Sequence, residues 1–318
     1  MRSLEEVQLM MARSGIPGRD AFQLPTSPKR FPDGGWYRME IAGIERPEVV
    51  EAVADESAKR GMPIHRLIST VSGSTLLDDA QLKRFARLAA DARMEVLITP
   101  GPRAGWDIGR QIVTPEGSLS GGRFRGSDQL SYAIADILRC IDLGFRGFLI
   151  MDEGLMWLVN ELREKGDIPK DVVFKVSIFA GHANAAGGKV LESLGADTFN
   201  PVADLSIPQL AGIRQVVNIP MDIFITIGDS WGGMNRFYDC PEIARVAAPC
   251  YFKIETVGPA HAATPGAVYR AWTSTSYLAE RGRDMVKFAE IIHQLVQTTW
   301  PEARMSEPGV ADLAIPRP

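Results

Sequence analysis

Short runs of β-branched and aromatic residues alternate along this chain with longer stretches in which apolar residues recur at helical spacing. This alternation predicts repeated strand–helix units and a parallel sheet. Eight runs have the character of strands, and they begin near Trp36, Ile64, Glu95, Gly147, Val172, Thr198, Met221 and Cys250. Eight units in one chain favour an α/β fold of the (β/α)8 TIM-barrel type. A doubly wound open sheet is the competing fold, but no GxGxxG follows any strand, so an NAD site is not expected.

The chain divides into an arm, a barrel and a tail. Residues 1–35 are rich in Pro, Gly and polar side chains, which predicts an irregular N-terminal arm. The barrel is expected over residues 36–300 and the C-terminal tail over 301–318. An insertion over 101–127 follows the third strand. The predicted helices lie near 46–60, 78–93 and 206–217, with a long closing helix or helix pair from about 264 to 300.

Composition narrows the range of functions. The 318 residues include 35 basic and 39 acidic side chains, a net charge of −4, and the basic residues are scattered. Nucleic-acid binding needs a concentrated positive face and is not expected, and no apolar run is long enough to span a membrane. Cys140, Cys240 and Cys250 form neither a disulfide framework nor a CxxC metal site. Acidic residues also stand where an export signal would be apolar, so we expect a cytoplasmic protein.

The strand period places ionisable side chains inside the predicted barrel. Alternate strand residues point inward, whereas the outward ones pack under helices and are apolar. Applied to the first, fifth and eighth strands, this rule turns inward Arg38, Glu40, Lys175, Ser177, Lys253 and Glu255. Because the eighth strand of a barrel lies beside the first, we expect Glu40 to meet Lys253.

These inward charges have two interpretations. One is an ion-pair network that only fills the barrel, since buried ionisable groups must be paired. The other is catalysis or substrate binding, which we favour because a structural barrel interior is normally Val, Ile and Leu. On that interpretation Glu40, Lys175, Lys253 and Glu255 are candidate catalytic residues. Arg38 and Ser177 are candidate substrate ligands.

Further polar residues follow the carboxyl ends of the strands, where barrels keep their active sites. They are Asp152, Glu153, His182, Asn200, Asp229 and His261. Carboxylates and imidazoles from different strand ends can hold a divalent cation, and we assign Glu153, His182, Asp229 and His261 to such a site. Asp152 is a further candidate catalytic residue and Asn200 a substrate ligand. The alternatives are helix capping for Asp152 and Asp229, and a loop role for His182.

A lysine mechanism is the alternative to a metal. An amine held in an apolar barrel has a lowered pKa, becomes nucleophilic and can form a Schiff base with a carbonyl substrate, as in aldolase chemistry. Lys175 is the better candidate, because Ser177 is the only other inward polar group near it on its own strand. Lys253 has Glu255 and Glu40 as expected neighbours, and these would keep it charged.

Two segments that follow strands are candidates for binding an anion. The loop Gly228–Gly233 is Gly-rich where many barrels bind phosphate through backbone amides, which makes Gly232 and Gly233 candidate substrate ligands. The insertion carries several arginines, and Arg103 lies nearest a strand end, so we assign it to the substrate anion. His65, at the start of the second strand, and His293, in the closing helix, are expected to be structural.

Several short motifs recur in a fixed order over about residues 191–277. They are Leu194-Gly195-Ala196-Asp197, Asp204-Leu205-Ser206, the strand from Met221 to Ile225, Phe252-Lys253-Ile254-Glu255, and Val268-Tyr269-Arg270. In these motifs the chain resembles the U32 peptidase-like family. Members have barrel-like catalytic domains, and some carry an iron–sulfur cluster on four cysteines and serve in hydroxylation of RNA bases or quinone precursors.

The resemblance implies a barrel in which Lys253 and Glu255 are site residues. It does not extend to the cluster, because three scattered cysteines cannot supply its ligands, and we expect no iron–sulfur cluster here. The chain also has no HExxH motif and no recognisable Ser-His-Asp set, so the peptidase activity implied by the family name lacks its residues.

The sequence therefore predicts a barrel enzyme that acts on a small anionic carboxylate- or carbonyl-bearing metabolite. The expected chemistry is that of a lyase, aldolase-like, or of an isomerase, assisted by a divalent metal or by a barrel lysine. The alternatives are a peptidase or amide hydrolase and a non-catalytic ligand-binding barrel. The apolar stretch of the closing helix, around Ile292 and Leu295, either covers the barrel or forms a contact within a homo-oligomer.

Overall fold

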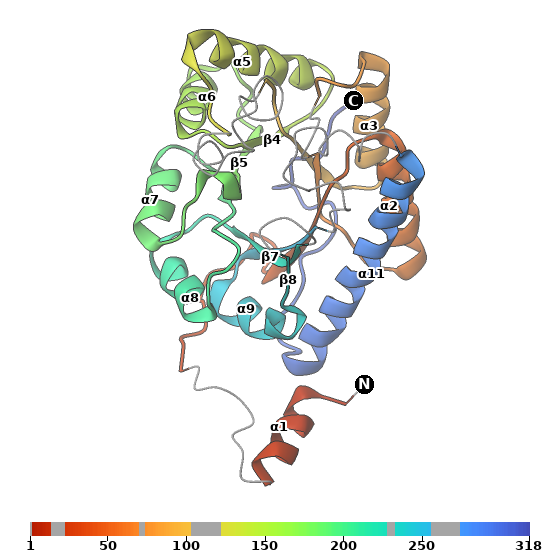
Figure 1. Cartoon of the computed structure of the whole chain (residues 1–318), viewed down its shortest axis with the longest axis vertical. Helices are drawn as coiled ribbons and strands as arrows, with labels where there is room; N and C mark the ends of the chain where they lie inside the picture. Colours follow the sequence, from red (N-terminus) through yellow and green to blue (C-terminus); the bar gives the residue numbers. More distant parts are fainter. Residues whose placement is uncertain (1, 14–22, 70–73, 103–121, 228–232, 256–273) are drawn as a thin grey trace.

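A computed structural model describes residues 2–13, 23–69, 74–102, 122–227, 233–255 and 274–318. Within them, eight parallel strands close into a barrel (Figure 1). The strands are β1 (Tyr37–Ala42), β2 (Arg66–Ser69), β3 (Glu95–Ile98), β4 (Gly147–Ile150), β5 (Val173–Val176), β6 (Thr198–Phe199), β7 (Met221–Ile227) and β9 (Cys250–Glu255). Pairing of β9 with both β7 and β1 completes the ring. The TIM barrel is thereby confirmed and the open sheet is excluded.

Eight of the described helices surround this barrel as an outer ring (Figure 1). They are α2 (Pro47–Arg60), α3 (Asp79–Asp91), α5 (Gly126–Asp142), α6 (Glu153–Lys165), α7 (Ala185–Ser193), α8 (Ile207–Val216), α9 (Cys240–Ala247) and α11 (Thr275–Thr299). Two short 3-10 helices, η2 (Ile178–Ala180) and η4 (Phe237–Asp239), and a short strand β8 (Met234–Asn235) antiparallel to β7 complete the fold.

Local sequence signals explain where the helices begin and end. Asp78 and Gln81 form a capping box at the start of α3, because each side chain accepts a hydrogen bond from the other residue's backbone N–H. Pro47 opens α2, and Gly61 ends it in the left-handed conformation, with φ 60°, that glycine adopts without strain.

The main hydrophobic core lies between the strands and the helices. Outward strand residues such as Met39, Ile41 and Phe252 are completely buried in it. The long helix α11 packs against α2 and α9, and its Ile292 and Val296 are completely buried. The apolar stretch of the closing helix therefore covers its own barrel.

Both ends of the chain have defined structure. The arm is not irregular throughout, since α1 (Leu4–Arg13) is a helix, although none of its residues is buried. The tail packs against the amino end of the barrel: Met305 bridges to Tyr37, and Ser306 and Ala314 are at most 2% exposed. Among the helices that the structure describes, we find none with the length and apolar character needed to cross a bilayer.

Candidate active site

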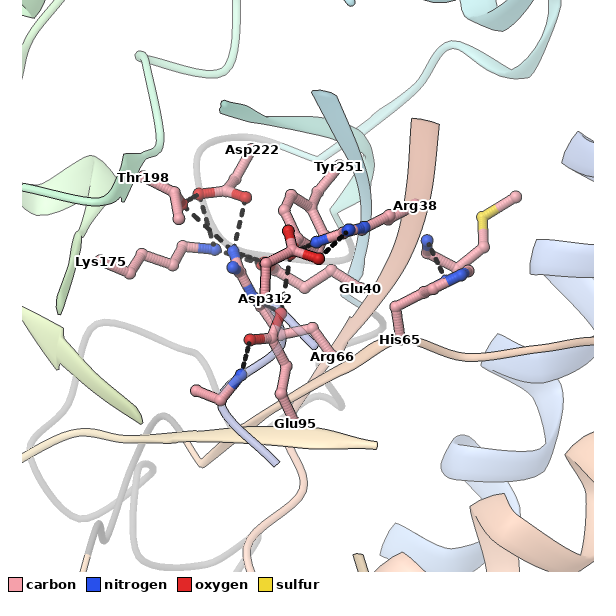
Figure 2. Close-up of polar contacts among 12 residues, drawn as sticks. Arg38, Glu40, His65, Arg66, Glu95, Lys175, Thr198, Asp222, Tyr251 and Asp312 are labelled. Carbon is pink, nitrogen blue, oxygen red and sulfur yellow. Dashed lines mark hydrogen bonds and ion pairs between the residues drawn. The ribbon is translucent and has the colours of Figure 1, made fainter. Parts of the chain in front are cut away.

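Charged side chains from six strands meet inside the barrel, and Figure 2 shows those from β1, β2, β3, β5 and β7. Three are cations and three are carboxylates, each at most 3% exposed: Glu40, Arg66, Glu95, Lys175, Asp222 and Lys253. Placing unpaired charges in such an interior would cost several kcal/mol each, so their mutual contacts decide whether the barrel is stable. The pairing described below balances the two signs within this group.

Both interior lysines use the same carboxylate oxygen. Lys253 Nζ donates to Glu40 Oε1 at 2.9 Å, as the adjacency of the first and last barrel strands predicts. Lys175 Nζ donates to the same oxygen and also lies 3.4 Å from Asp222 Oδ2. The sequence identifies only Ser177 as an inward polar neighbour of Lys175 on its own strand, whereas Glu40 and Asp222 reach Lys175 from β1 and β7. A rule that examines one strand at a time cannot identify neighbours on other strands.

Burial and pairing act in opposite directions on these groups. Burial lowers the pKa of Lys175 to about 8, and the carboxylates of Asp222 and Glu40 only partly oppose it. For Glu40 burial alone would raise the pKa, but the cations of Lys175, Lys253 and Arg66 hold the pKa of Glu40 well below its usual range. An ionised Glu40 therefore faces an amine that loses its proton more readily than an ordinary lysine.

Arg66 connects the three carboxylates. Its Nε donates to Glu95 Oε1 at 2.7 Å, while its Nη1 lies 2.7 Å from Asp222 Oδ1 and 3.2 Å from Glu40 Oε2. The guanidinium also stacks 3.6 Å above the ring centre of Tyr251. A planar fork with several donors is suited to such a position, and a lysine would not reproduce it.

The amino end of the barrel is closed by the tail. Glu95 Oε2 accepts the backbone N–H of Ala314 at 2.9 Å, and Arg38 donates to Ser306 Oγ at 3.0 Å and to Asp312 Oδ1 at 2.9 Å. Arg38, a predicted substrate ligand, is thus brought together with the tail and not with the residues at the carboxyl ends of the strands.

The two histidines expected to be structural are held by the fold. His65 is completely buried, accepts the N–H of Met39 at Nδ1 (3.1 Å), and faces the Ser306 carbonyl through Nε2 (2.9 Å). Burial lowers the pKa of His65 to about 4, so the ring is neutral. Nδ1 of His293 lies 2.8 Å from the Tyr37 hydroxyl.

Three more predicted residues lie at the carboxyl ends of the strands. Glu255, at the end of β9, is partly buried, and burial raises its pKa against the effect of the Lys253 ammonium. Asn200 Nδ2 donates to the Asp222 carbonyl at 2.5 Å, and Ser177 Oγ accepts the N–H of Phe179 at 3.3 Å. Lys253 and Glu255 lie two residues apart on β9, and their roles as site residues stay predictions.

A second polar cluster lies after β4 and β5. Asp152 caps α6, with Oδ1 accepting the N–H of Leu155 at 2.9 Å. Glu153 pairs with Arg123, and its Oε1 lies 2.9 Å from His182 Nε2. Burial, followed by the charge of Arg123, lowers the pKa of His182.

The structure therefore describes only some of the predicted metal ligands. Glu153 and His182 contact each other directly, and Glu153 is already paired with an arginine that an ion would have to displace. Asp229 and His261, like Arg103 and Gly232, lie outside the described residues; Gly233 is described and precedes β8 with φ 70°. Among the described residues no group of three or more His, Cys, Asp or Glu is arranged to hold a metal ion. The metal site stays a prediction.

The sequence reasoning missed half of the interior network. Arg66, Glu95 and Asp222 occupy the second, third and seventh strands, where apolar neighbours such as Leu67, Val96 and Ile223 face the helices. The same two-residue period that identified Lys175 would have turned these three inward, had it been applied to those strands.

Comparison with known proteins adds little to this geometry. No family model matches the chain, and no curated protein matches it. A U32 peptidase, Mk0906, is a solved structure similar to 63% of this chain and 72% of its own, at 18% identity and a TM-score of 0.40. This is at most a distant likeness of fold to the U32 peptidases.

Two further solved structures align over more of the chain. A truncated 3-deoxy-D-arabino-heptulosonate 7-phosphate synthase from Thermotoga maritima aligns with 91% of this chain and 94% of its own, at 11% identity and a TM-score of 0.45. A D-psicose 3-epimerase from Clostridium cellulolyticum H10 aligns with 80% and 99%, at 12% identity and a TM-score of 0.46. Identities and scores this low transfer no family and no activity to this chain.

Proposed function

We propose that this protein is a cytoplasmic barrel enzyme that acts on a small anionic metabolite bearing a carboxylate and a carbonyl group. The proposed chemistry is that of an aldolase-like lyase or an isomerase, through an imine on a barrel lysine. The observation that carries the proposal is the sharing of one buried carboxylate oxygen of Glu40 by the ammonium groups of Lys175 and Lys253. The three cysteines, all free and buried, agree with a reducing compartment.

Lys175 is the proposed nucleophile because burial makes its amine reactive. With a pKa of about 8, about one tenth of the Lys175 side chains are neutral at pH 7. An ordinary lysine, with its pKa of 10.5, would be neutral in only about one molecule in 3,000. Burial therefore increases the nucleophilic fraction by roughly 300-fold, which is the activation that imine-forming lysines require.

Lys253 and Glu255 have complementary roles in the proposed reaction. The Lys253 ammonium, fixed by Glu40, donates a hydrogen bond to the carbonyl oxygen and stabilises the negative charge that develops there. Glu255 follows on the same face of β9, and burial raises its pKa, which makes it a better proton acceptor than an ordinary carboxylate. The arginines of the insertion, Arg103 first, are expected to bind the anionic end of the substrate.

The test is reductive trapping. Wild-type protein is incubated with a panel of 2-oxo acids and aldehydes in the presence of cyanoborohydride, and intact mass is measured. We expect one stable adduct per chain with at least one member of the panel and none in Lys175→Met. The matched control is Lys165→Met, which removes an exposed lysine on α6 and is expected to trap like wild type. Failure of every carbonyl compound to form a specific adduct would refute the proposal.

Glu255→Gln separates catalysis from folding. Once trapping has identified a carbonyl substrate, we expect this variant to keep the wild-type urea midpoint but to lose turnover, because glutamine cannot exchange a proton. Full turnover in Glu255→Gln would remove Glu255 from the proposed site.

A metal-assisted reaction is the second candidate, and the contact between Glu153 and His182 is the observation that favours it. These two residues, with Asp229 and His261, would hold a divalent ion that polarises the substrate carbonyl. Elemental mass spectrometry of the purified protein, with activity followed through chelation and add-back, tests it. A stoichiometric ion that restores activity would support this candidate, and activity unaffected by chelation or added ions would count against it.

A further inference from the structure

Asp222 is a buried carboxylate that has no role in the reaction proposed above. It lies on β7 and is completely buried. Its Oδ1 lies 2.7 Å from Arg66 Nη1, and its Oδ2 lies 3.4 Å from Lys175 Nζ and accepts the hydroxyl hydrogen of Thr198. One oxygen is thus fixed by an arginine, whereas the other faces the proposed nucleophile.

We propose that Asp222 is the internal proton acceptor of Lys175. This inference rests on the proposed function, in which Lys175 forms an imine. Asp222 takes one proton from the Lys175 ammonium, and the neutral amine then forms a C–N bond to the substrate carbonyl carbon while the C=O π electrons move to oxygen.

The remaining protons can be followed to the end of the step. The Lys253 ammonium protonates the new alkoxide to give a hydroxyl, and the attacking nitrogen passes its extra proton to Lys253. Asp222 returns its stored proton to the hydroxyl, which leaves as water as the nitrogen lone pair forms the C=N bond of a protonated imine. Carbonyl compound and ammonium thus give protonated imine and water, with no outside acid or base consumed.

The surroundings of Glu40 and Asp222 explain why Asp222 is the acceptor. Glu40 faces three cations, Lys175, Lys253 and Arg66, which hold its pKa well below the usual range and make it a poor proton acceptor. Asp222 faces Lys175 and Arg66 but also has the Glu40 carboxylate near it, and burial raises its pKa despite the two cations. Of the two carboxylates in contact with Lys175, Asp222 therefore takes a proton more readily.

The groups that act on the Lys175 ammonium come from several other strands of the barrel. The charged ones are Glu40 from β1, Arg66 from β2, Asp222 from β7 and Lys253 from β9. Transfer of a proton from Lys175 to Asp222 leaves the total charge of Lys175 and these four groups unchanged. The neutral amine that results is therefore present at a fraction that does not depend on the pH of the solvent, as long as the pair holds one proton.

The wild-type pH profile of trapping tests this consequence directly. The rate of imine formation is measured from pH 5.5 to 9.5 with cyanoborohydride in excess, so that imine formation limits the rate. A lysine that must lose its proton to solvent slows about tenfold for each pH unit below its pKa. We expect the rate for Lys175 to stop falling and to level off within this pH range, because Asp222 keeps supplying neutral amine.

A conservative substitution at Thr198 should change the trapping rate in a direction that the structure predicts. Thr198→Val removes the hydroxyl that stabilises the ionised form of Asp222, so Asp222 should hold the Lys175 proton more strongly. A hydrogen bond to a charged group corresponds to roughly a tenfold effect on such an equilibrium. We expect the trapping rate of Thr198→Val at pH 6 to rise by up to about tenfold relative to Thr198→Ser, which keeps the hydroxyl. A purely structural role for Thr198 would only lower the rate.

The outcomes separate this inference from the proposed function. A rate for Lys175 that keeps falling tenfold per pH unit to pH 5.5, with Thr198→Val no faster than Thr198→Ser, overturns the role of Asp222 and leaves the imine intact. Absence of any Lys175 adduct at every pH overturns the proposed function and the role of Asp222 with it. Urea denaturation of both Thr198 variants verifies that each is folded under the trapping conditions.

Discussion

Replacing Lys175 by Met should change how the stability of the protein depends on pH. In the folded protein burial lowers the pKa of Lys175 from 10.5 to about 8. Between these two values the unfolded chain holds a proton that the folded protein has released, so the free energy of unfolding rises with pH. A difference of about 2.5 pKa units at 1.36 kcal/mol per unit amounts to about 3 kcal/mol. Lys175→Met lacks this titrating group, so its free energy of unfolding should not show this increase with pH.

The assay is urea denaturation at pH 7.5, 8.5, 9.5 and 10.5, followed by the fluorescence of the six tryptophans. The stability of wild type minus that of Lys175→Met should increase by about 3 kcal/mol across this range. Titration of buried tyrosines and cysteines affects both proteins and cancels in the difference. Lys165→Met, in which an exposed lysine is removed, should follow the wild-type pH dependence. A difference that stays constant or shrinks as the pH rises would refute a lowered pKa for Lys175.

Two further predictions concern the framework around the site. For His65→Gln, the difference in free energy of unfolding from wild type should narrow by about 3 kcal/mol between pH 7 and pH 4 in chemical denaturation. The reason is that the pKa of His65 is about 4 in the folded protein, below the ordinary 6.5, so that acidification destabilises only wild type. A constant gap would contradict the buried neutral ring between Met39 and Ser306. Gly147→Ala should lower the free energy of unfolding by about 1–3 kcal/mol, because the added Cβ would lie 2.2 Å from a methyl carbon of Leu97. A loss below about 0.5 kcal/mol would show that β4 tolerates the methyl group.

The sequence was a good guide wherever one local rule decides the structure. Each of the eight barrel strands begins within two residues of its predicted start; the largest difference is at β2, which begins at Arg66 and not at Ile64. The helices expected near 46–60, 78–93 and 206–217 were equally reliable, since α2, α3 and α8 span Pro47–Arg60, Asp79–Asp91 and Ile207–Val216. Alternation along single strands correctly placed Lys175 and Lys253 in the interior.

The remaining features depend on contacts between residues far apart in sequence. Glu40 reaches Lys175 from β1, which lies 135 positions earlier and on the opposite side of the ring, and Asp222 reaches it from β7, two strands away. The sequence does not encode these distances. The tail residues Asp312 and Ala314 bind Arg38 and Glu95 through side-chain and backbone groups that have no periodic signature. Such pairings follow from the closed barrel and become visible only in three dimensions.

The central claim is that Lys175 forms an imine with a carbonyl substrate, and peptide mapping of the reduced adduct tests it most directly. Trypsin cleaves after unmodified Lys175 and yields fragments 171–175 and 176–189, but it does not cleave after an alkylated lysine. We predict that the trapped protein yields the continuous fragment 171–189, with the mass of the reduced substrate added at Lys175. An adduct found only elsewhere, for example on a continuous fragment 246–270 that contains Lys253, would contradict the account.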